Sequence, residues 1–187
     1  MYLLGLYLGD GCLSEHRRKV WRLRIVLDLR YPGIVDECEA AMEAVVPRNR
    51  VGRTLKSGGY AKPQDDPSSV EVSAYSRSWP CLFPQHGPGR KHERPIVLAE
   101  WQRDLVTKAP EPLLRGLIHS DGCRFINTGT NWRCARYSFS NRSEDILGIF
   151  QAACALVGVR CTRAPHTIYV SRKADVARLD EFIGPKR

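Results

Sequence analysis

The chain reads Leu3-Leu4-Gly5-Leu6-Tyr7-Leu8-Gly9-Asp10-Gly11 near its start and Leu114-Arg115-Gly116-Leu117-Ile118-His119-Ser120-Asp121-Gly122 far downstream. Each stretch is largely apolar, carries small residues four positions apart and ends in Asp-Gly. The two aspartates are 111 positions apart, and a Trp-Arg pair repeats at the same offset, at Trp21 and Trp132. Two copies with matching surroundings predict a duplicated half.

Small residues four apart lie on one face of a helix and allow a second helix backbone to approach closely. We therefore expect the two stretches to form helices that pack together, with Asp10 and Asp121 side by side at their ends. Gly11 and Gly122 fit the left-handed position that often ends a helix. Both apolar runs are shorter than the roughly 20 residues that a membrane span needs, so no membrane partner is expected.

Position by position, the two stretches resemble the LAGLIDADG motif of a family of homing endonucleases and related proteins, in its single-chain form with two motifs. The sixth position departs from the motif, because Leu8 and His119 replace an acidic residue. The resemblance implies that the final aspartate of each copy, Asp10 and Asp121, carries the chemistry.

Two carboxylates at two helix C-termini repel one another unless a cation joins them. Mg²⁺ favours oxygen ligands and often takes only one or two carboxylates with phosphate and water. We expect Mg²⁺ at Asp10 and Asp121, with Gly9 and Ser120 as further ligands, and Mn²⁺ or Ca²⁺ as substitutes in binding. A lone Asp-Gly would more simply end a helix, but the repeat favours the metal.

The 187 residues carry a formal charge of +9, and arginine outnumbers lysine. This balance favours a polyanionic partner, and with the repeated aspartates it indicates double-stranded DNA. The sequence shows no signal peptide, so a cytoplasmic protein is expected, nucleoid-associated in a bacterium. None of the seven cysteines forms a C-x-x-C pair, which favours reduced thiols over a zinc ribbon; Cys81, His86 and His92 are the one loose Cys/His cluster.

Alternation and helical spacing predict an α+β fold with two pseudo-symmetric αββαββα halves, each with an antiparallel sheet. The halves are 1–108, with a loop insertion at 84–94, and 109–187. After a short connection, the first half is expected to hold a strand at 21–30, a helix at 34–46, strands at 51–56 and 70–75, and helices at 78–83 and 96–108. The second is expected to hold its motif helix at 112–120, strands at 124–127, 133–141, 159–163 and 167–171, and helices at 143–157 and 173–183, with Ser143 as N-cap.

Each sheet is expected to bury one face under helices and to present a polar face to DNA. The predicted DNA-binding residues of the first half are Arg22, Arg24, Asp28, Arg30, Arg53, Lys56, Glu71, Ser73 and Tyr75. Those of the second half are Arg136, Ser138, Ser140, Thr167, Tyr169 and Ser171. Tyr137 and Phe139 are expected to face inward. Because this register disagrees by one step with the register set by Trp132-Arg133, a bulge near Cys134 and Ala135 is expected.

The expected activity is site-specific, metal-dependent hydrolysis of phosphodiesters in double-stranded DNA. The resemblance implies a basic residue after the last strand of each half that stabilises the transition state: Arg77, and Arg172 or Lys173. Two alternatives stay open, a DNA-binding transcriptional regulator that has lost catalysis and an RNA-binding maturase. One chain holds both half-sites, so a monomer is expected. No phosphate loop, nucleophile elbow or cofactor motif supports a metabolic α/β enzyme.

Overall fold

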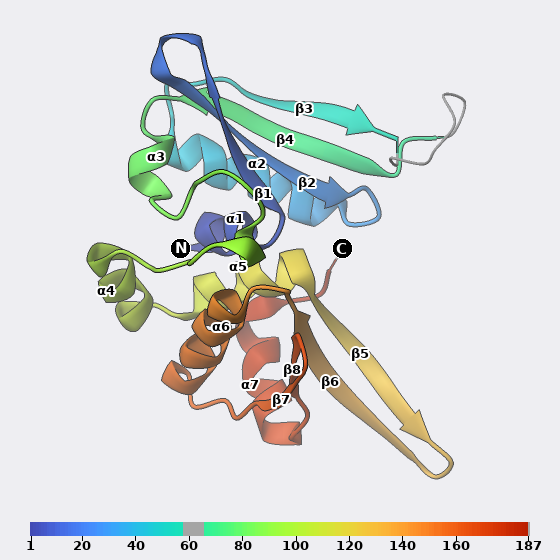
Figure 1. The fold of residues 1–187 in the computed structure, drawn as a ribbon. Coiled ribbons are helices and arrows are strands. Elements are labelled where there is room, and N and C mark those ends of the chain that lie inside the picture. Colours follow the sequence, from blue (N-terminus) through green and yellow to red (C-terminus); the bar gives the residue numbers. More distant parts are fainter. Residues whose placement is uncertain (58–65, 187) are drawn as a thin grey trace. The chain divides into compact units, whose positions relative to one another are not determined.

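A computed structural model describes residues 1–57 and 66–186 (Figure 1). The chain divides into two compact units by packing: residues 10–87 with Lys186 form one, and residues 1–9 with 88–185 form the other. This division follows packing, whereas the boundary predicted at residue 108 follows the duplication, so the boundary stays a prediction. Each unit contains one four-stranded antiparallel sheet with helices beside it, which confirms the α+β class.

In the unit of residues 10–87 the strands lie in the order β1-β2-β4-β3. Their bounds are β1 Gly11–His16, β2 Val20–Asp28, β3 Val51–Lys56 and β4 Ser69–Ser76, with a 3₁₀ turn η1 at Arg17–Lys19. Helices α2 (Pro32–Val45) and α3 (Trp79–Leu82) complete the unit, and α2 lies along one face of the sheet (Figure 1). Strand β1 was not predicted, because the sequence there indicated only a short connection.

The expected alternation on β2 is confirmed, because Leu23, Ile25 and Leu27 are buried on the side that faces the helices. Val72 of β4 lies opposite Ile25 and is buried beside it. The indole of Trp79 lies in the same core and donates a hydrogen bond to the Ala74 carbonyl at 3.0 Å.

In the unit of residues 1–9 and 88–185 the strands lie in the order β5-β6-β8-β7. The strands are β5 Gly122–Gly129, β6 Trp132–Ser140, β7 Thr162–Ala164 and β8 Thr167–Val170. The helices are α1 Tyr2–Asp10, whose last residue belongs to the other unit, α4 Glu100–Lys108, α5 Glu111–Asp121, α6 Glu144–Leu156 and α7 Lys173–Ile183, with a 3₁₀ turn η2 at Lys91–Glu93. Within the described residues, no helix is both long and apolar enough to cross a membrane.

The core of this unit follows from two confirmed predictions. Tyr137 and Phe139 of β6 point inward, and Phe139 stacks on Phe150 of α6 with ring centroids 4.5 Å apart. The Ser143 hydroxyl caps α6 by accepting a hydrogen bond from the Ile146 amide. Beyond the end of β8, strands β5 and β6 continue as a projecting two-stranded hairpin (Figure 1).

Two expectations about β6 are wrong. The pairing of β5 with β6 runs without interruption from Gly122 opposite Phe139 to Gly129 opposite Trp132, so there is no bulge. Trp132 instead points to the outer face, where it is half exposed. Gly11 lies opposite Ile25 and Gly122 lies opposite Phe139, so β2 and β6 correspond with an offset of 114 rather than 111. Trp21 and Trp132 are therefore not equivalent, and the repeat of the Trp-Arg pair is a coincidence.

Candidate functional site

The two motif helices pack together through their small residues, as predicted. A methyl group on Gly116 of α5 would lie 2.2 Å from the Tyr2 carbonyl oxygen and 3.0 Å from the Gly5 Cα. A methyl group on Gly5 of α1 would lie 2.6 Å from the Leu113 carbonyl oxygen. Only glycine allows backbones to approach this closely, so both positions are fixed by the packing of α1 on α5.

The second pair of small residues lies at the C-terminal ends of these helices. A methyl group on Gly9 would lie 2.2 Å from the Ser120 hydroxyl oxygen and 3.1 Å from Oδ2 of Asp121. Asp121 is the last residue of α5 and is half-buried, and Asp10, which follows Gly9, is the exposed last residue of α1. Gly122 is extended at φ −105° rather than left-handed and begins β5, so the predicted glycine cap is wrong there.

Lys91 and Asn141, which sequence reasoning missed, lie at these helix ends. The Lys91 ammonium donates to the carbonyl oxygens of Tyr7, at 2.5 Å, and Gly9, at 2.9 Å. A cation at the end of α1 offsets the partial negative charge of the last carbonyls. Asn141 donates from Nδ2 to Oδ2 of Asp121 at 2.7 Å, and its own Oδ1 accepts from the Ser143 amide at 2.8 Å. The side chain of Asn141 is thus held so that it positions the carboxylate of Asp121.

His119, the residue that departs from the motif, has a structural setting. Its ring is buried, with Nδ1 2.9 Å from the Tyr2 hydroxyl and Nε2 3.1 Å from the Ile183 carbonyl oxygen. It therefore joins α1 and α7 to α5.

The outer face of the β1–β4 sheet carries a network of charged side chains. Arg22 donates from Nη2 to Glu71 Oε1 at 2.6 Å and to the Ser73 hydroxyl at 3.0 Å. Glu71 is only 4% exposed, and Lys56 lies 3.7 Å from its other oxygen. Arg22 also lies over the ring of Tyr75. The Nε atoms of Arg22 and Arg24 are buried without a hydrogen-bond partner, which is a costly arrangement in a free protein.

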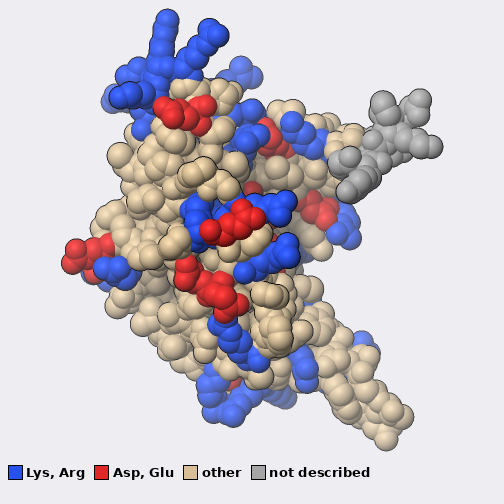
Figure 2. Space-filling view, in the orientation of Figure 1, with Lys and Arg blue, Asp and Glu red and all other residues tan. Residues whose placement is uncertain are grey.

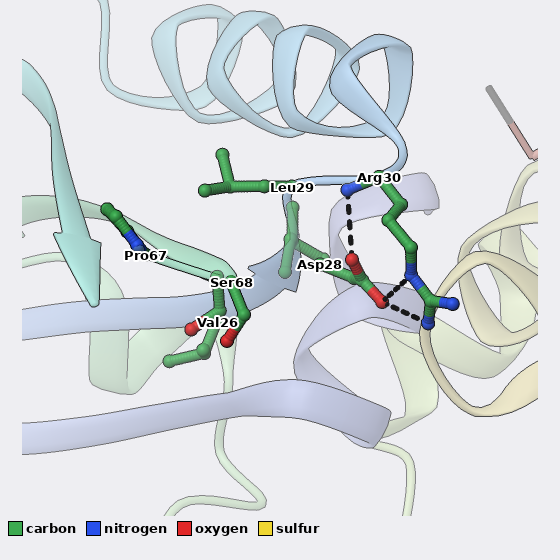
Figure 3. A pocket seen from close by; sticks show the side chains of 8 residues that line it. Val26, Asp28, Leu29, Arg30, Pro67 and Ser68 are labelled. Atoms are coloured by element: carbon green, nitrogen blue, oxygen red, sulfur yellow. Dashed lines mark hydrogen bonds and ion pairs between the residues drawn. The ribbon is translucent and has the colours of Figure 1, made fainter. Parts of the chain in front are cut away.

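Of the other charged residues predicted in this half, one is placed differently and two lie at the end of β2. Arg53 lies on the face that carries α2, where it binds Asp36 and Glu39, so it is not part of the outer face. Asp28 and Arg30 bind one another at the end of β2, beside a pocket that Val26, Pro67 and Ser68 also line (Figure 3). The hydrogen bonds from Arg30 lower the pKa of Asp28 below its ordinary value.

The outer face of the β5–β8 sheet is hydroxyl-rich instead of charged. Ser138 and Ser140 lie opposite Tyr169 and Thr167, and the Ser140 and Thr167 hydroxyls are 3.0 Å apart. Arg136 shares this face, and its Nε is also buried without a partner. Ser171, the remaining predicted residue of this half, follows β8 directly.

The turn between β1 and β2 is a basic cluster that sequence reasoning also missed. Arg17, Arg18 and Lys19 form η1 and are exposed, and Arg18 and Lys19 have φ values of 64° and 56°. In Figure 2, Lys and Arg side chains gather over the turn between β1 and β2. Three adjacent basic residues were a visible signal, but they lay within the stretch interpreted as a connection.

No family model matches the sequence, and no curated protein matches it. Among solved structures, the N-terminal LAGLIDADG domain of DUF199/WhiA is 15% identical with a TM-score of 0.57, over 100% of this chain and 80% of that chain. Full-length DUF199/WhiA from Thermatoga maritima is 14% identical with a TM-score of 0.58, and this chain covers 55% of it. The homing endonuclease I-WcaI, bound to its DNA recognition sequence, is 10% identical with a TM-score of 0.59, over 99% of this chain and 80% of that chain. The protein has the LAGLIDADG fold.

Within the LAGLIDADG fold, the predicted basic residues lie just beyond the last strand of each sheet. Arg77 follows the end of β4, and Arg172 and Lys173 lie where the chain passes from β8 into α7. Their catalytic role stays a prediction, whereas Lys91 contacts the last carbonyls of α1.

Each motif helix ends in an aspartate, and carboxylate oxygens are the type of ligand that a hard divalent cation such as Mg²⁺ prefers. The Gly9 carbonyl is engaged by Lys91, and the Ser120 hydroxyl donates to carbonyls of its own helix, so neither supports the predicted ligand role. Within the described residues, no three His, Cys, Asp or Glu side chains gather as a closed metal site.

Proposed function

We propose that this LAGLIDADG protein is a site-specific endonuclease of double-stranded DNA. One observation carries the proposal: both motif helices end in aspartate, and their packing places Gly9 within contact distance of Ser120 and Asp121. A carboxylate at the end of each motif helix weakens simple DNA binding, because its negative charge repels the phosphates. The DNA-bound state of the homing endonuclease I-WcaI supports duplex DNA as the substrate.

The outer faces of the two sheets bind the duplex in this proposal. Arginine and lysine side chains on η1 and β2 contact phosphates and set the affinity, and side chains in the middle of the strands contact base edges. The guanidinium of Arg24 supports this role, because its Nη2 has the weak sulfur acceptor of Cys12 at 3.6 Å, and a phosphate or base oxygen would be a stronger acceptor. We further propose that one chain acts as a monomer, because it carries both faces.

In this proposal Asp10 and Asp121, the last residues of the motif helices, would supply carboxylate ligands to Mg²⁺. When bound, Mg²⁺ would make a water molecule more acidic and would offset negative charge on the scissile phosphate. Asn141 keeps the carboxylate of Asp121 in one orientation through the hydrogen bond to Oδ2. The ammonium of Lys91, held by the carbonyls of Tyr7 and Gly9, stabilises the negative charge that develops on the phosphate oxygens.

The test is cleavage of a randomised duplex library with Mg²⁺ by the full chain, beside Asp10→Asn and Asp121→Asn. Asp104→Asn is the matched control, because Asp104 is exposed on α4. We expect cutting at one site, which is lost in both motif variants and kept in the control. Cutting that survives in both variants would contradict the role of the aspartates.

A second function, that of a DNA-binding regulator, is favoured by the likeness to the LAGLIDADG domain of DUF199/WhiA, which spans this whole chain. In that case Lys91 and Asn141 serve to neutralise the motif ends rather than to support cleavage. Sequence-specific binding without cutting in Mg²⁺ or Mn²⁺ would establish this alternative.

A further inference from the structure

The two sheets can be compared position by position, because both begin directly after a motif. Gly11 lies opposite Ile25 and Val72, and Gly122 lies opposite Phe139 and Ile168. Counting from these positions, Arg22 corresponds to Arg136, Arg24 to Ser138, Glu71 to Thr167 and Ser14 to Phe125.

At these positions the first sheet presents charge. Arg24 lies in the middle of the sheet, opposite Cys12 on β1 and Ser73 on β4. Its Nη2 has only the weak sulfur acceptor of Cys12, at 3.6 Å, and its Nε has no partner. Glu71 holds the neighbouring Arg22 at 2.6 Å, so that side chain is fixed before any ligand arrives. The centre of this face therefore offers two arginines: Arg22 is held by oxygen acceptors, and Arg24 has only a weak sulfur acceptor.

At the corresponding positions the second sheet presents hydroxyl and aromatic groups. Ser138 occupies the position of Arg24 in the first sheet, and Thr167 occupies the position of Glu71. The hydroxyl of Thr167 lies next to that of Ser140. Phe125 lies opposite Arg136, and Trp132 is 50% exposed further along the same face. The end of the projecting β5–β6 hairpin is almost free of charged side chains in the displayed view (Figure 2). Arg136 is the one charged residue of the β5–β8 strands on this outer face.

We propose that the two sheets recognise half-sites of different base composition, an inference that rests on the proposed DNA binding. The β1–β4 sheet takes the G·C-richer half-site, because arginine pairs with the O6 and N7 atoms of guanine in the major groove. The β5–β8 sheet takes the A·T-richer half-site, because threonine methyls and aromatic rings contact the thymine methyl group and asparagine pairs with adenine. Asn127, opposite Cys134, supplies such an amide on this face. The target is accordingly asymmetric in composition.

The test is selection of bound sequences from randomised duplex DNA in Ca²⁺, so that the readout is binding and not cleavage. The wild-type chain is compared with Arg24→Ser and Ser138→Arg, which exchange the residues at corresponding positions. Arg24→Ser should weaken the preference for one guanine in the G·C-richer half by roughly tenfold or more and leave the other half unchanged. Ser138→Arg should create a guanine preference in the A·T-richer half. Arg136→Ser is the matched control, because it removes one arginine from the other sheet and should relax one position there.

The outcomes separate this inference from the proposed function. Selected sites with equal composition in both halves would overturn the inference and leave DNA binding intact. A uniform loss of affinity in Arg24→Ser, without a change in sequence preference, would show that Arg24 contacts phosphate, which also overturns it. Failure of the wild-type chain to bind any duplex would overturn both proposals. Circular dichroism of each variant confirms that it is folded, and Ser138→Arg, as a gain of preference, does not depend on a loss.

Discussion

Replacement of Gly116 by alanine tests the packing that joins the two motif helices. The added methyl would lie 2.2 Å from the Tyr2 carbonyl oxygen, 3.0 Å from Gly5 Cα and 3.1 Å from the Leu6 nitrogen. All three are backbone atoms, so α1 must withdraw by about 1 Å to restore ordinary contact distances. Overpacking of this kind typically costs 1–3 kcal/mol, and the gap that opens elsewhere around α1 adds to it.

Alanine also improves helix propensity by about 1 kcal/mol over glycine, which leaves a net loss of up to about 2 kcal/mol before the cost of the gap is added. In a protein of this size each kcal/mol shifts the melting temperature by about 2–4 °C, so we expect a fall of several degrees, up to roughly 8 °C. Gly148→Ala is the matched control, because Gly148 lies within α6 and its added methyl has nothing within 4 Å. That variant should melt a few degrees higher than the wild type.

Calorimetry and circular dichroism of the two variants give the answer. Equal melting temperatures for Gly116→Ala and Gly148→Ala would refute the close approach of α1 to α5.

A second pair of variants tests the other end of the same contact. Gly9→Ala places a methyl 2.2 Å from the Ser120 hydroxyl oxygen and 2.5 Å from its Cβ, and Ser120→Gly removes both atoms. The double variant should therefore recover most of the stability that Gly9→Ala loses, with a coupling of about 1–2 kcal/mol, whereas additive losses would contradict the contact.

Two further measurements examine the outer face and the support beneath the second sheet. Cys12 and Cys123 are exposed on the outer faces, so bound duplex DNA should cover them and slow their alkylation, measured by mass spectrometry, by roughly tenfold or more. Cys81 of α3 is exposed elsewhere and should react at the same rate with and without DNA. Equal protection of all three thiols would contradict the proposed interface. Hydrogen bonds from Arg124 lower the pKa of Asp180, so the ionised carboxylate stabilises the fold above the ordinary aspartate pKa, and this stability is lost as pH falls through the lowered value. Asp180→Asn should show a smaller drop in denaturant midpoint between neutral and strongly acidic pH than the wild type, and an unchanged drop would exclude this contribution.

The sequence predicted the parts of the fold that periodicity controls. The alternation of Leu23, Ile25 and Leu27 predicted β2 because each alternate side chain is buried against helices. Strand β1 was missed because it is an edge strand held by backbone pairing to β2, and only Gly11 in it is buried. A strand with so little buried surface leaves no apolar alternation to recognise.

The register of β6 shows how a repeat can mislead. The motif aspartates repeat because helix packing fixes them, but the two hairpins that follow differ in length. The pairing of β1 with β2 ends at His16 opposite Val20, and that of β5 with β6 ends at Gly129 opposite Trp132. The longer second hairpin shifts β6 by three residues, an odd number, and an odd shift moves every side chain to the other face.

Placement of single charged side chains depends on neighbours that are distant in sequence, and here sequence reasoning was weakest. Arg53 and Lys56 are both basic residues of β3, yet Asp36 and Glu39 of α2 bind Arg53 on the face of the sheet that carries α2. Lys91 is 82 residues from Gly9, whose carbonyl it binds, and its loop was notable only for its composition. Neither contact has a local signal, because each is made by a polar side chain whose partner is brought near by the fold.

The endonuclease and the regulator share every feature of the outer faces and differ only at the ends of the motif helices. If the protein were a regulator, removal of the carboxylates would stabilise its complex with DNA, because each adds negative charge to a helix C-terminus that would face the DNA. Retention of both Asp10 and Asp121, together with Asn141 held by the Ser143 amide to orient one of them, is therefore a cost to binding. Cleavage gives that cost a use. Lys91 serves either function, because a cation at the end of α1 favours the folded helix and an approaching phosphate alike. The aspartates, rather than the lysine or the DNA-binding faces, are the residues on which the choice between the two functions depends.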